Sequence, residues 1–250
     1  MPQARESSTE VEVADGVTTV RFNHPPVNAL DLDLLDSVIA AMRRIDGPVV
    51  ITGAGKCFSA GVDLRAIVDG GSEYTHRFMA SLSEALLAVF DHPAPVVAAI
   101  NGHAIAGGCV FAMCADIRLM SAGTIGLTEL AVGVPFPVAA LEICRYAMGT
   151  SATRAALQPT TIDIATASAR RWIDEDVPQT DLLPRAIAIA GELGRHSPAA
   201  YAATKEQLHR PARAAIEAGA EIDAQVRASW MSDDTRAQIT AFLDALARGH

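Results

Sequence analysis

The sequence predicts an α/β core followed by a helical C-terminal region. Short apolar strands, glycine-bearing loops and amphipathic helices recur in that order, which is typical of an α/β architecture. Past roughly Pro135 the pattern becomes almost wholly helical. At 250 residues the chain is long for one small domain and short for two full ones, so we expect one main core with an appendage.

The individual elements are predicted from periodicity and turn residues. Alternation of apolar and polar residues on either side of Asp15-Gly16 indicates a β-hairpin. Asp31 stands near the start of a predicted helix, and Ser197-Pro198 is typical of an N-cap followed by proline. The predicted elements are strands at 10–14, 17–22, 49–52, 93–100 and 117–120, helices at 30–42, 75–90 and 108–115, and loops at 23–28, 53–61 and 101–108.

Composition and charge limit the class of protein. The formal net charge of −9 argues against a nucleic-acid partner, although a local basic group can still bind an anionic ligand. No apolar stretch is long enough to span a membrane and no secretory signal is visible, so we expect a cytoplasmic protein. The four cysteines lie in apolar segments without zinc spacing, which favours reduced core thiols and predicts no metal site.

The first segment with chemical potential is GAGKCFSAGVDL, residues 53–64. Its glycines and small residues follow a strand and can bring backbone N–H groups close to a ligand. Cys57 follows Gly55-Lys56 where a P-loop needs Ser or Thr, and Phe58 occupies the last glycine position of a dinucleotide motif. A nucleophile elbow fails as well, because glycine does not precede Ser59 at the required spacing. An ordinary strand-to-helix turn is the alternative interpretation.

The second segment is NGHAIAGGCVFAMCAD, residues 101–116, in which Gly107 and Gly108 open an apolar helix. A helix N-terminus offers free N–H donors and a partial positive charge, and glycines let a substrate oxygen approach them. The alternative is tight helix packing through small residues.

The third segment is IGLTELAVGVPFP, residues 125–137, where Glu129 is a lone carboxylate in an apolar run. Apolar surroundings penalise the anion, so its pKa should rise, which suits a general base near neutral pH. The alternative is a surface glutamate at an element's end.

Together these three segments resemble the crotonase (enoyl-CoA hydratase/isomerase) family in order and approximate spacing. NHPPVNAL at 23–30 looks like that family's first loop, and SPAAYAATKEQL at 197–208 is similar to one of its helical segments. The resemblance covers about residues 9–245. It implies a spiral core of repeated ββα units over 1–195 and a helical region over 196–250 that mediates assembly into a homotrimer or a dimer of trimers.

The resemblance also implies the substrate and its site. The substrate would be an acyl-CoA thioester, with no permanently bound cofactor. Matched by motif, the N–H groups of Val62 and Gly107 would form an oxyanion hole for the thioester carbonyl, and Glu129 would be catalytic. Lys56 is a further candidate for the CoA phosphates, with a solvated loop lysine as the alternative. The CoA-binding residues implied are Ala60, Gly61, Asp63, Leu64, Arg65 and Gly108.

The chain departs from the hydratases of this family at one position. Those hydratases hold a water molecule between two glutamates. At the position that matches one of these glutamates this chain has Val110, which cannot orient or deprotonate water. A single carboxylate can still move one proton between two carbons, so the sequence predicts a Δ3,Δ2-enoyl-CoA isomerase. In that reading Val110 and Phe111 keep the site dry.

Other departures and alternatives stay open. Arg170-Arg171-Trp172 replaces a glycine-containing turn, and residues 230–243 lack the family's Glu-Gly pair. Hydration, thioester hydrolysis or C–C cleavage could use a recruited residue, for which the candidates are Glu73, His76 and His103. A non-catalytic acyl-CoA binder is the third hypothesis. The helix over 74–87 is expected to influence acyl-chain preference.

Overall fold

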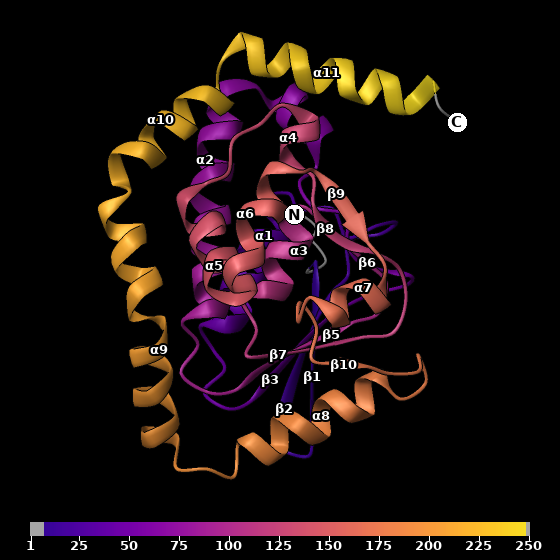
Figure 1. Cartoon of the computed structure of the whole chain (residues 1–250), viewed down its shortest axis with the longest axis vertical. Coiled ribbons are helices and arrows are strands. Elements are labelled where there is room, and N and C mark those ends of the chain that lie inside the picture. The colour runs from indigo at the N-terminus through magenta and orange to yellow at the C-terminus, as the bar shows by residue number, and fades with distance from the viewer. Residues whose placement is uncertain (1–7, 249–250) are drawn as a thin grey trace, which may run out of the picture.

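The computed structural model describes residues 8–248, which fold into two β-sheets surrounded by helices (Figure 1). The larger sheet has the strand order β1-β2-β3-β5-β7-β10, and the smaller has β4-β6-β8-β9. The larger sheet consists of Thr9–Ala14, Val17–Phe22, Val49–Gly53, Val96–Ile100, Ile117–Met120 and Glu175–Asp176 in that order, and the smaller of Cys57–Ser59, His103–Ile105, Ile125–Leu127 and Thr160–Ile162.

A ββα unit is repeated three times along the chain, as β3-β4-α2, β5-β6-α3 and β7-β8-α4. The first strands of the units pair in parallel within the larger sheet, and the second strands are neighbours in parallel within the smaller sheet. The three helices are Leu64–Phe90, Gly107–Met113 and Glu129–Val132. This arrangement confirms the predicted α/β spiral of ββα units.

Both faces of the larger sheet are covered, which explains why its central strands are continuously apolar. Val49 and Ile51 of β3 point into the main core, whereas Val50 packs on the opposite face with residues of α8 (Leu182–Leu193). Such two-sided burial is the physical reason that these strands are recognisable in the sequence.

The helix that follows the first motif was placed wrongly by the sequence. α2 begins at Leu64, eleven residues before the predicted start at Thr75, because the Asp63 side chain accepts hydrogen bonds from the backbone N–H groups of Arg65 and Ala66. Gly71 has a φ of +67° and interrupts the helix, so Gly70-Gly71 hides the helical periodicity of the first piece. In contrast, α1 (Leu32–Met42) begins within two residues of its predicted start, and Asp31, which the sequence places near that start, is its N-cap.

Several short strands were missed. β4 and β6 lie inside segments predicted as loops, and β9 and β10 interrupt the region predicted to be almost wholly helical. Strands of two or three residues are too short to show alternation, and only their partners in the sheet define them. The remaining helices of this region are α5 (Val138–Met148), the 3₁₀ turn η1 (Gly149–Ser151), α6 (Ala152–Leu157) and α7 (Ile164–Ala169).

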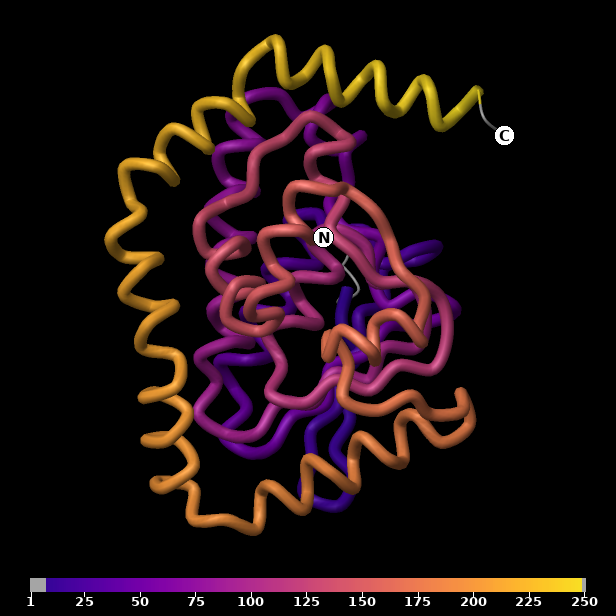
Figure 2. Tube along the Cα trace, in the orientation of Figure 1, coloured from indigo at the N-terminus to yellow at the C-terminus, as the bar shows by residue number. Residues whose placement is uncertain are grey.

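The C-terminal helices form an outer band around the core. α9 (Pro198–Ala218) starts at the predicted Ser197 cap and packs along α5. It leads into α10 (Ala220–Trp230) and α11 (Asp233–Arg248), which crosses over α2 and α4 (Figure 2). The division of the chain at 195/196 remains a prediction.

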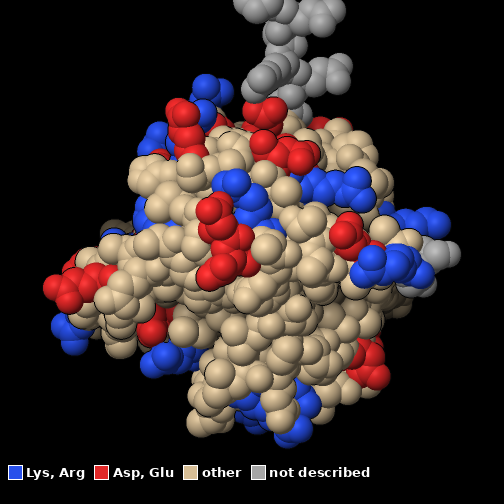
Figure 3. All heavy atoms as spheres, turned by 90° about the horizontal axis from the view of Figure 1, so that it is seen from above, with Lys and Arg blue, Asp and Glu red and all other residues tan. Residues whose placement is uncertain are grey.

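The surface seen from the α11 side carries interspersed acidic and basic side chains, with no continuous area of one sign (Figure 3). No helix within residues 8–248 has the length and apolar character needed to cross a lipid bilayer. All four cysteines are buried free thiols, and the described residues contain no cluster of His, Cys, Asp and Glu suited to a metal ion.

Candidate active site

A cavity of about 590 Å³ lies where the three motifs and the C-terminal helices meet. Its polar groups are few and include Glu129, Thr128, Asp63 and Arg65. The rest of the wall is predominantly apolar and includes Leu82, Leu86, Val110, Val132, Val134, Ala140, Trp230, Phe242, Leu243 and Leu246. A largely apolar cavity with a few polar groups is the usual form of a small-molecule site.

The loop of the first motif is fixed by the segment before α1. The backbone N–H of Leu30 donates to the Gly61 carbonyl at 2.8 Å, and the N–H of Asp63 donates to the Leu30 carbonyl at 2.9 Å. Gly61 has a φ of +84°, and a Cβ there would stand 2.7 Å from the Ile105 carbonyl oxygen. Only glycine allows this turn and this close approach to the second motif.

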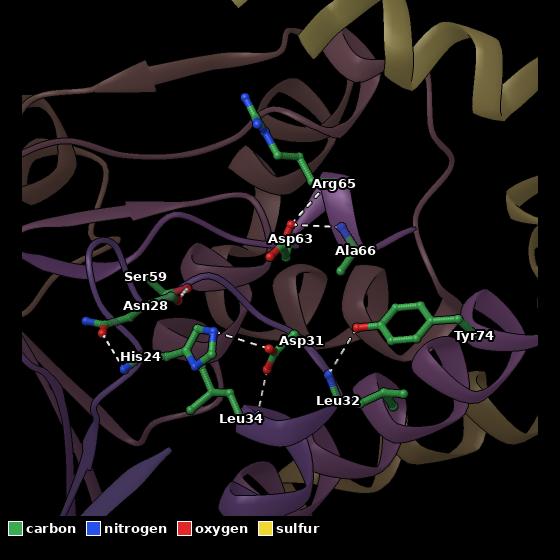
Figure 4. A network of polar contacts seen from close by, with 10 residues as sticks. All are labelled: His24, Asn28, Asp31, Leu32, Leu34, Ser59, Asp63, Arg65, Ala66 and Tyr74. Carbon is green, nitrogen blue, oxygen red and sulfur yellow. Dashed lines mark hydrogen bonds and ion pairs between the residues drawn. The ribbon is translucent and has the colours of Figure 1, made fainter. Parts of the chain in front are cut away.

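Two buried polar residues that the sequence did not single out shape the same loop. The Asn28 side-chain amide donates to the carbonyls of Ala54 and Cys57 at 3.0 and 2.8 Å. The Ser59 hydroxyl donates to the Asn28 carbonyl at 2.8 Å (Figure 4). It also accepts the N–H of Gly61 at 3.1 Å. Small polar residues between apolar ones are the only sequence signal for this role.

The second motif meets the first at the start of α3. Ala106, just before the helix, has the unusual φ of +50° with ψ of −122°, a strained conformation for an L-residue. A Cβ on Gly61 would stand 3.2 Å from the Gly107 nitrogen, so the two loops are in contact. Among the hydrogen bonds of residues 8–248, none uses the N–H of Val62 or of Gly107. These two donors border one cavity and are available to a ligand oxygen.

The two glycines that the resemblance implies for CoA binding are not on the cavity wall. Neither Gly61 nor Gly108 lines the cavity, in contrast to Ala60, which does. A Cβ on Gly108 would stand 2.3 Å from the Ser59 carbonyl oxygen, so this glycine is required for packing of α3 against β4. Their assignment as CoA-contacting residues remains a prediction.

The start of α2 brings a charged pair to the cavity mouth. Asp63 uses its carboxylate to cap the helix, with both hydrogen bonds at 3.0 Å, and Arg65 projects from the first turn into solvent (Figure 4). Leu64, Asp63 and Arg65 all line the cavity. Lys56 is exposed and does not line it.

Glu129 is the first residue of α4, with 8 % of its surface exposed. Its Oε2 atom is buried without a hydrogen-bond partner. Burial raises the pKa of the Glu129 carboxyl to about 7, and backbone N–H groups of Glu129 and Thr128 oppose this rise. The pKa of Glu129 is therefore raised, as predicted from the sequence. A carboxyl group with this pKa is suited to exchanging protons near neutral pH.

Val110 lies on the cavity wall and is 1 % exposed, so no carboxylate stands at this position. Within residues 8–248, the only carboxylates on the wall are Glu129 and the helix-capping Asp63. Phe111 does not line the cavity, contrary to the expected role in keeping it dry, because it packs edge-on against Phe22 in the core.

The recruited residues considered from sequence lie elsewhere. Glu73, His76 and His103 are exposed and do not line the cavity, and His103 faces Thr124 through its Nδ1 atom at 3.1 Å. On α2, Leu82 and Leu86 reach the cavity, whereas the Tyr74 hydroxyl accepts the N–H of Leu32 at 3.4 Å (Figure 4).

Known proteins with similar sequences and structures bear on this site. The sequence model of the family described as enoyl-CoA hydratase/isomerase matches residues 12–248. A Thermus thermophilus protein assigned as an enoyl-CoA hydratase is 29 % identical over 94 % of this chain and 97 % of its own length. Rat mitochondrial enoyl-CoA delta isomerase 1 is 26 % identical over 90 % of this chain and 82 % of its own length.

The fold has a close counterpart among solved structures. The crystal structure of human mitochondrial delta3-delta2-enoyl-CoA isomerase superposes with a TM-score of 0.90 at 24 % identity, covering 97 % of this chain and 99 % of that one. The family match spans all three motifs and the cavity that they build. The chain therefore belongs to the enoyl-CoA hydratase/isomerase family, in the crotonase superfamily.

Proposed function

We propose that this protein binds an acyl-CoA thioester in the 590 Å³ cavity and catalyses Δ3,Δ2-enoyl-CoA isomerisation with Glu129 as its only acid and base. The observation that carries the proposal is a buried carboxyl group on the cavity wall, that of Glu129, whose Oε2 atom has no hydrogen-bond partner. The family resemblance adds that Val110 occupies the position of the hydratases' second glutamate. A lone carboxylate cannot hold a water between two acids, but it can return the same proton to another carbon of the same substrate.

In the proposed reaction Glu129 removes a proton from C2 of a 3-enoyl-CoA. The electron pair of the broken C–H bond passes into the thioester, which gives a dienolate with negative charge on the carbonyl oxygen. The Glu129 carboxyl then returns its proton to C4, the C2=C3 double bond forms and the carbonyl is restored. No atom is gained or lost, so the step needs no water and no cofactor.

The free N–H groups of Val62 and Gly107 would stabilise that oxygen. Both are fixed by backbone geometry before substrate arrives, so they do not reorganise as charge develops. Each such donor is typically worth about 3 kcal/mol of transition-state energy. The apolar wall strengthens this effect by excluding water, and the same exclusion keeps the Glu129 pKa raised.

Arg65 is placed to meet the negatively charged CoA moiety. It is exposed at the cavity mouth, and the capping of α2 by Asp63 fixes its backbone. The acyl chain would extend in the opposite direction, along Leu82 and Leu86 of α2 and the apolar residues of α11.

The test is product analysis of purified protein on matched 3-enoyl-CoA and 2-enoyl-CoA thioesters. Conversion of 3-enoyl-CoA to 2-enoyl-CoA is expected, and Glu129→Gln should lower kcat by about 10²- to 10⁴-fold. Glu73→Gln is the control, because Glu73 is an exposed glutamate outside the cavity. Full turnover by Glu129→Gln would refute the proposed acid and base.

Hydration is the second candidate, since similar proteins carry hydratase names. Rapid addition of water to 2-enoyl-CoA would favour it and would mean that a residue other than one at position 110 orients water. Release of free CoA or a shortened acyl product would indicate hydrolysis or C–C cleavage. Tight acyl-CoA binding without any turnover would indicate a binding protein.

The proposed assembly is a homotrimer or a dimer of trimers. The family resemblance supports it, as do exposed apolar side chains on α6, α9 and α10, namely Leu157, Leu208 and Ile222. Light scattering should give a multiple of three times the 26.2 kDa chain mass.

A further inference from the structure

The turn that carries Glu129 is short and lies against both α6 and α11. α4 has four residues, and the Glu129 carbonyl accepts the N–H groups of both Gly133 and Val134 at 3.1 Å. Gly133 ends the helix with a φ of +86°. A single turn has little stability of its own, so its position depends on what holds the chain that follows it.

The donors that oppose the rise of the Glu129 pKa are backbone N–H groups of its own turn, at Glu129 and Thr128, so the carboxyl does not attach α4 to another element. Its Oε2 has no hydrogen-bond partner, and no ion pair of Glu129 exists within residues 8–248. The other titratable groups near it are Asp63 and Arg65 on the cavity wall and the buried thiols Cys109 and Cys144. The backbone position of α4 therefore determines where the proton acceptor stands.

The segment after α4 is attached to α10 at two points. The indole Nε1 of Trp230 donates to the Pro135 carbonyl at 2.9 Å, and the Asp223 carboxylate accepts the N–H of Val138 at 3.2 Å. Trp230 is 3 % exposed and also lines the cavity. The indole hydrogen bond is the attachment nearer to Glu129, six residues along the chain.

We propose that Trp230 is a positioning residue for Glu129, holding the α4 turn in register with the cavity through the Pro135 carbonyl. The inference rests on the proposed role of Glu129 in proton transfer. It links the C-terminal helical region directly to the chemistry, beyond its part in closing the cavity. Misplacement of a catalytic group by about 1 Å can cost about 10²-fold in rate.

Trp230→Phe removes the N–H and keeps an aromatic ring on the wall. We expect kcat on 3-enoyl-CoA to fall by about ten- to a hundredfold, with KM changed less than about threefold. The pH profile should also change. Looser packing admits water, which lessens the desolvation of Glu129, so the rise of kcat/KM with pH should move below its value near 7.

Trp172 provides a matched control for the loss of an indole hydrogen bond. Trp172, the other of the two tryptophans, is 1 % exposed and donates its Nε1 to the Ser151 hydroxyl at 2.8 Å, away from the cavity. Trp172→Phe also removes one buried indole hydrogen bond, so it should lower stability while leaving kcat and the pH profile unchanged. Equal kinetics for the two variants would overturn the proposal.

A second replacement covers the case in which Trp230→Phe fails to fold. Benzothienylalanine incorporated in a Trp172→Phe background substitutes only residue 230, keeping the ring size while sulfur replaces the N–H. The same loss of kcat is expected, and unchanged kcat and pH profile would overturn the proposal. Glu129→Gln separates the two ideas: activity in that variant defeats the proposed function, whereas inactivity there with normal Trp230 variants defeats only the positioning role.

Discussion

Two carboxyl groups in this chain, the buried Glu129 and the half-buried Asp116, differ in the number of hydrogen-bond donors around them. Glu129 faces an apolar cavity without a partner for its Oε2 atom, whereas Asp116 accepts three hydrogen bonds through Oδ2. Those donors are the Lys205 ammonium at 2.9 Å, the Tyr201 hydroxyl at 3.1 Å and the Val96 backbone N–H at 2.8 Å. The Oε2 atom of Glu129 is free to exchange a proton, whereas Asp116 links α9 to β5 through its hydrogen bonds.

The difference shows how partners, rather than burial alone, decide what a buried acid does. Burial raises the Glu129 pKa to about 7 although backbone N–H groups of Glu129 and Thr128 oppose the rise, which makes its proton exchangeable near neutral pH at a cost in stability. Lys205, 7 % exposed at its side chain, compensates the charge of Asp116. Such a pair contributes little net energy when intact, but it is costly to break from one side.

The largest expected effect on stability comes from breaking the pair. Lys205→Met should lower the free energy of unfolding by about 3–5 kcal/mol, because it leaves the Asp116 charge uncompensated. Urea unfolding at pH 7 measures this. The double variant Asp116→Asn/Lys205→Met should lose less stability than the single variant, since it leaves no uncompensated charge. A larger loss in the double variant would show that the attraction itself, and not the uncompensated charge, dominates.

Glu129→Gln should raise the free energy of unfolding near neutral pH, and the size of this gain should depend on pH. The folded pKa of about 7 lies above the ordinary value of 4.5, so the folded wild type binds a proton that the unfolded chain has released. Wild-type stability should therefore fall as pH rises from about 4.5 to 7, by about 3 kcal/mol, and then level off.

The glutamine variant lacks this titration, so its stability relative to wild type should increase over the same pH window. Urea unfolding of both proteins at pH 4.5 and pH 8 gives the two differences to compare. A stability difference that is constant between the two pH values would mean that Glu129 is not desolvated in the folded protein.

The smallest expected effect is the loss of one neutral donor to Asp116. Tyr201→Phe removes a hydroxyl at 3.1 Å while Lys205 and Val96 remain, so the free energy of unfolding should fall by about 1–2 kcal/mol. Thermal unfolding at constant pH measures the change, and turnover per folded molecule should be unaffected. A loss as large as that of Lys205→Met would mean that the hydroxyl, not the ammonium, compensates the carboxylate.

The sequence supplied most of the fold because its signals are local or strongly apolar. β3 and β5 are buried on both faces, and α1 has its cap at Asp31. The start of α2 was wrong because Gly70-Gly71 interrupts the helical pattern, and the strands of two or three residues were missed because pairing alone defines them.

For the site, the sequence identified residues that lie within a recognisable motif. Glu129 stands out as a lone carboxylate in an apolar run, and the resemblance implies a second carboxylate at the position that Val110 occupies. Asn28, Ser59 and Trp230 were not singled out, because each forms a side-chain hydrogen bond to a backbone carbonyl at least 26 residues away along the chain.

The sequence by itself determined the α/β class, the positions of the central strands, the family resemblance and the presence of a lone carboxylate at Glu129. These depend on residue types and on spacings of a few positions. Only the tertiary structure decided that the N–H groups of Val62 and Gly107 border one cavity, that Glu129 is desolvated there, and that α10 and α11 complete its wall. Distance in space, solvent exclusion and hydrogen bonds across more than ninety residues arise when the chain packs, and no local pattern encodes them.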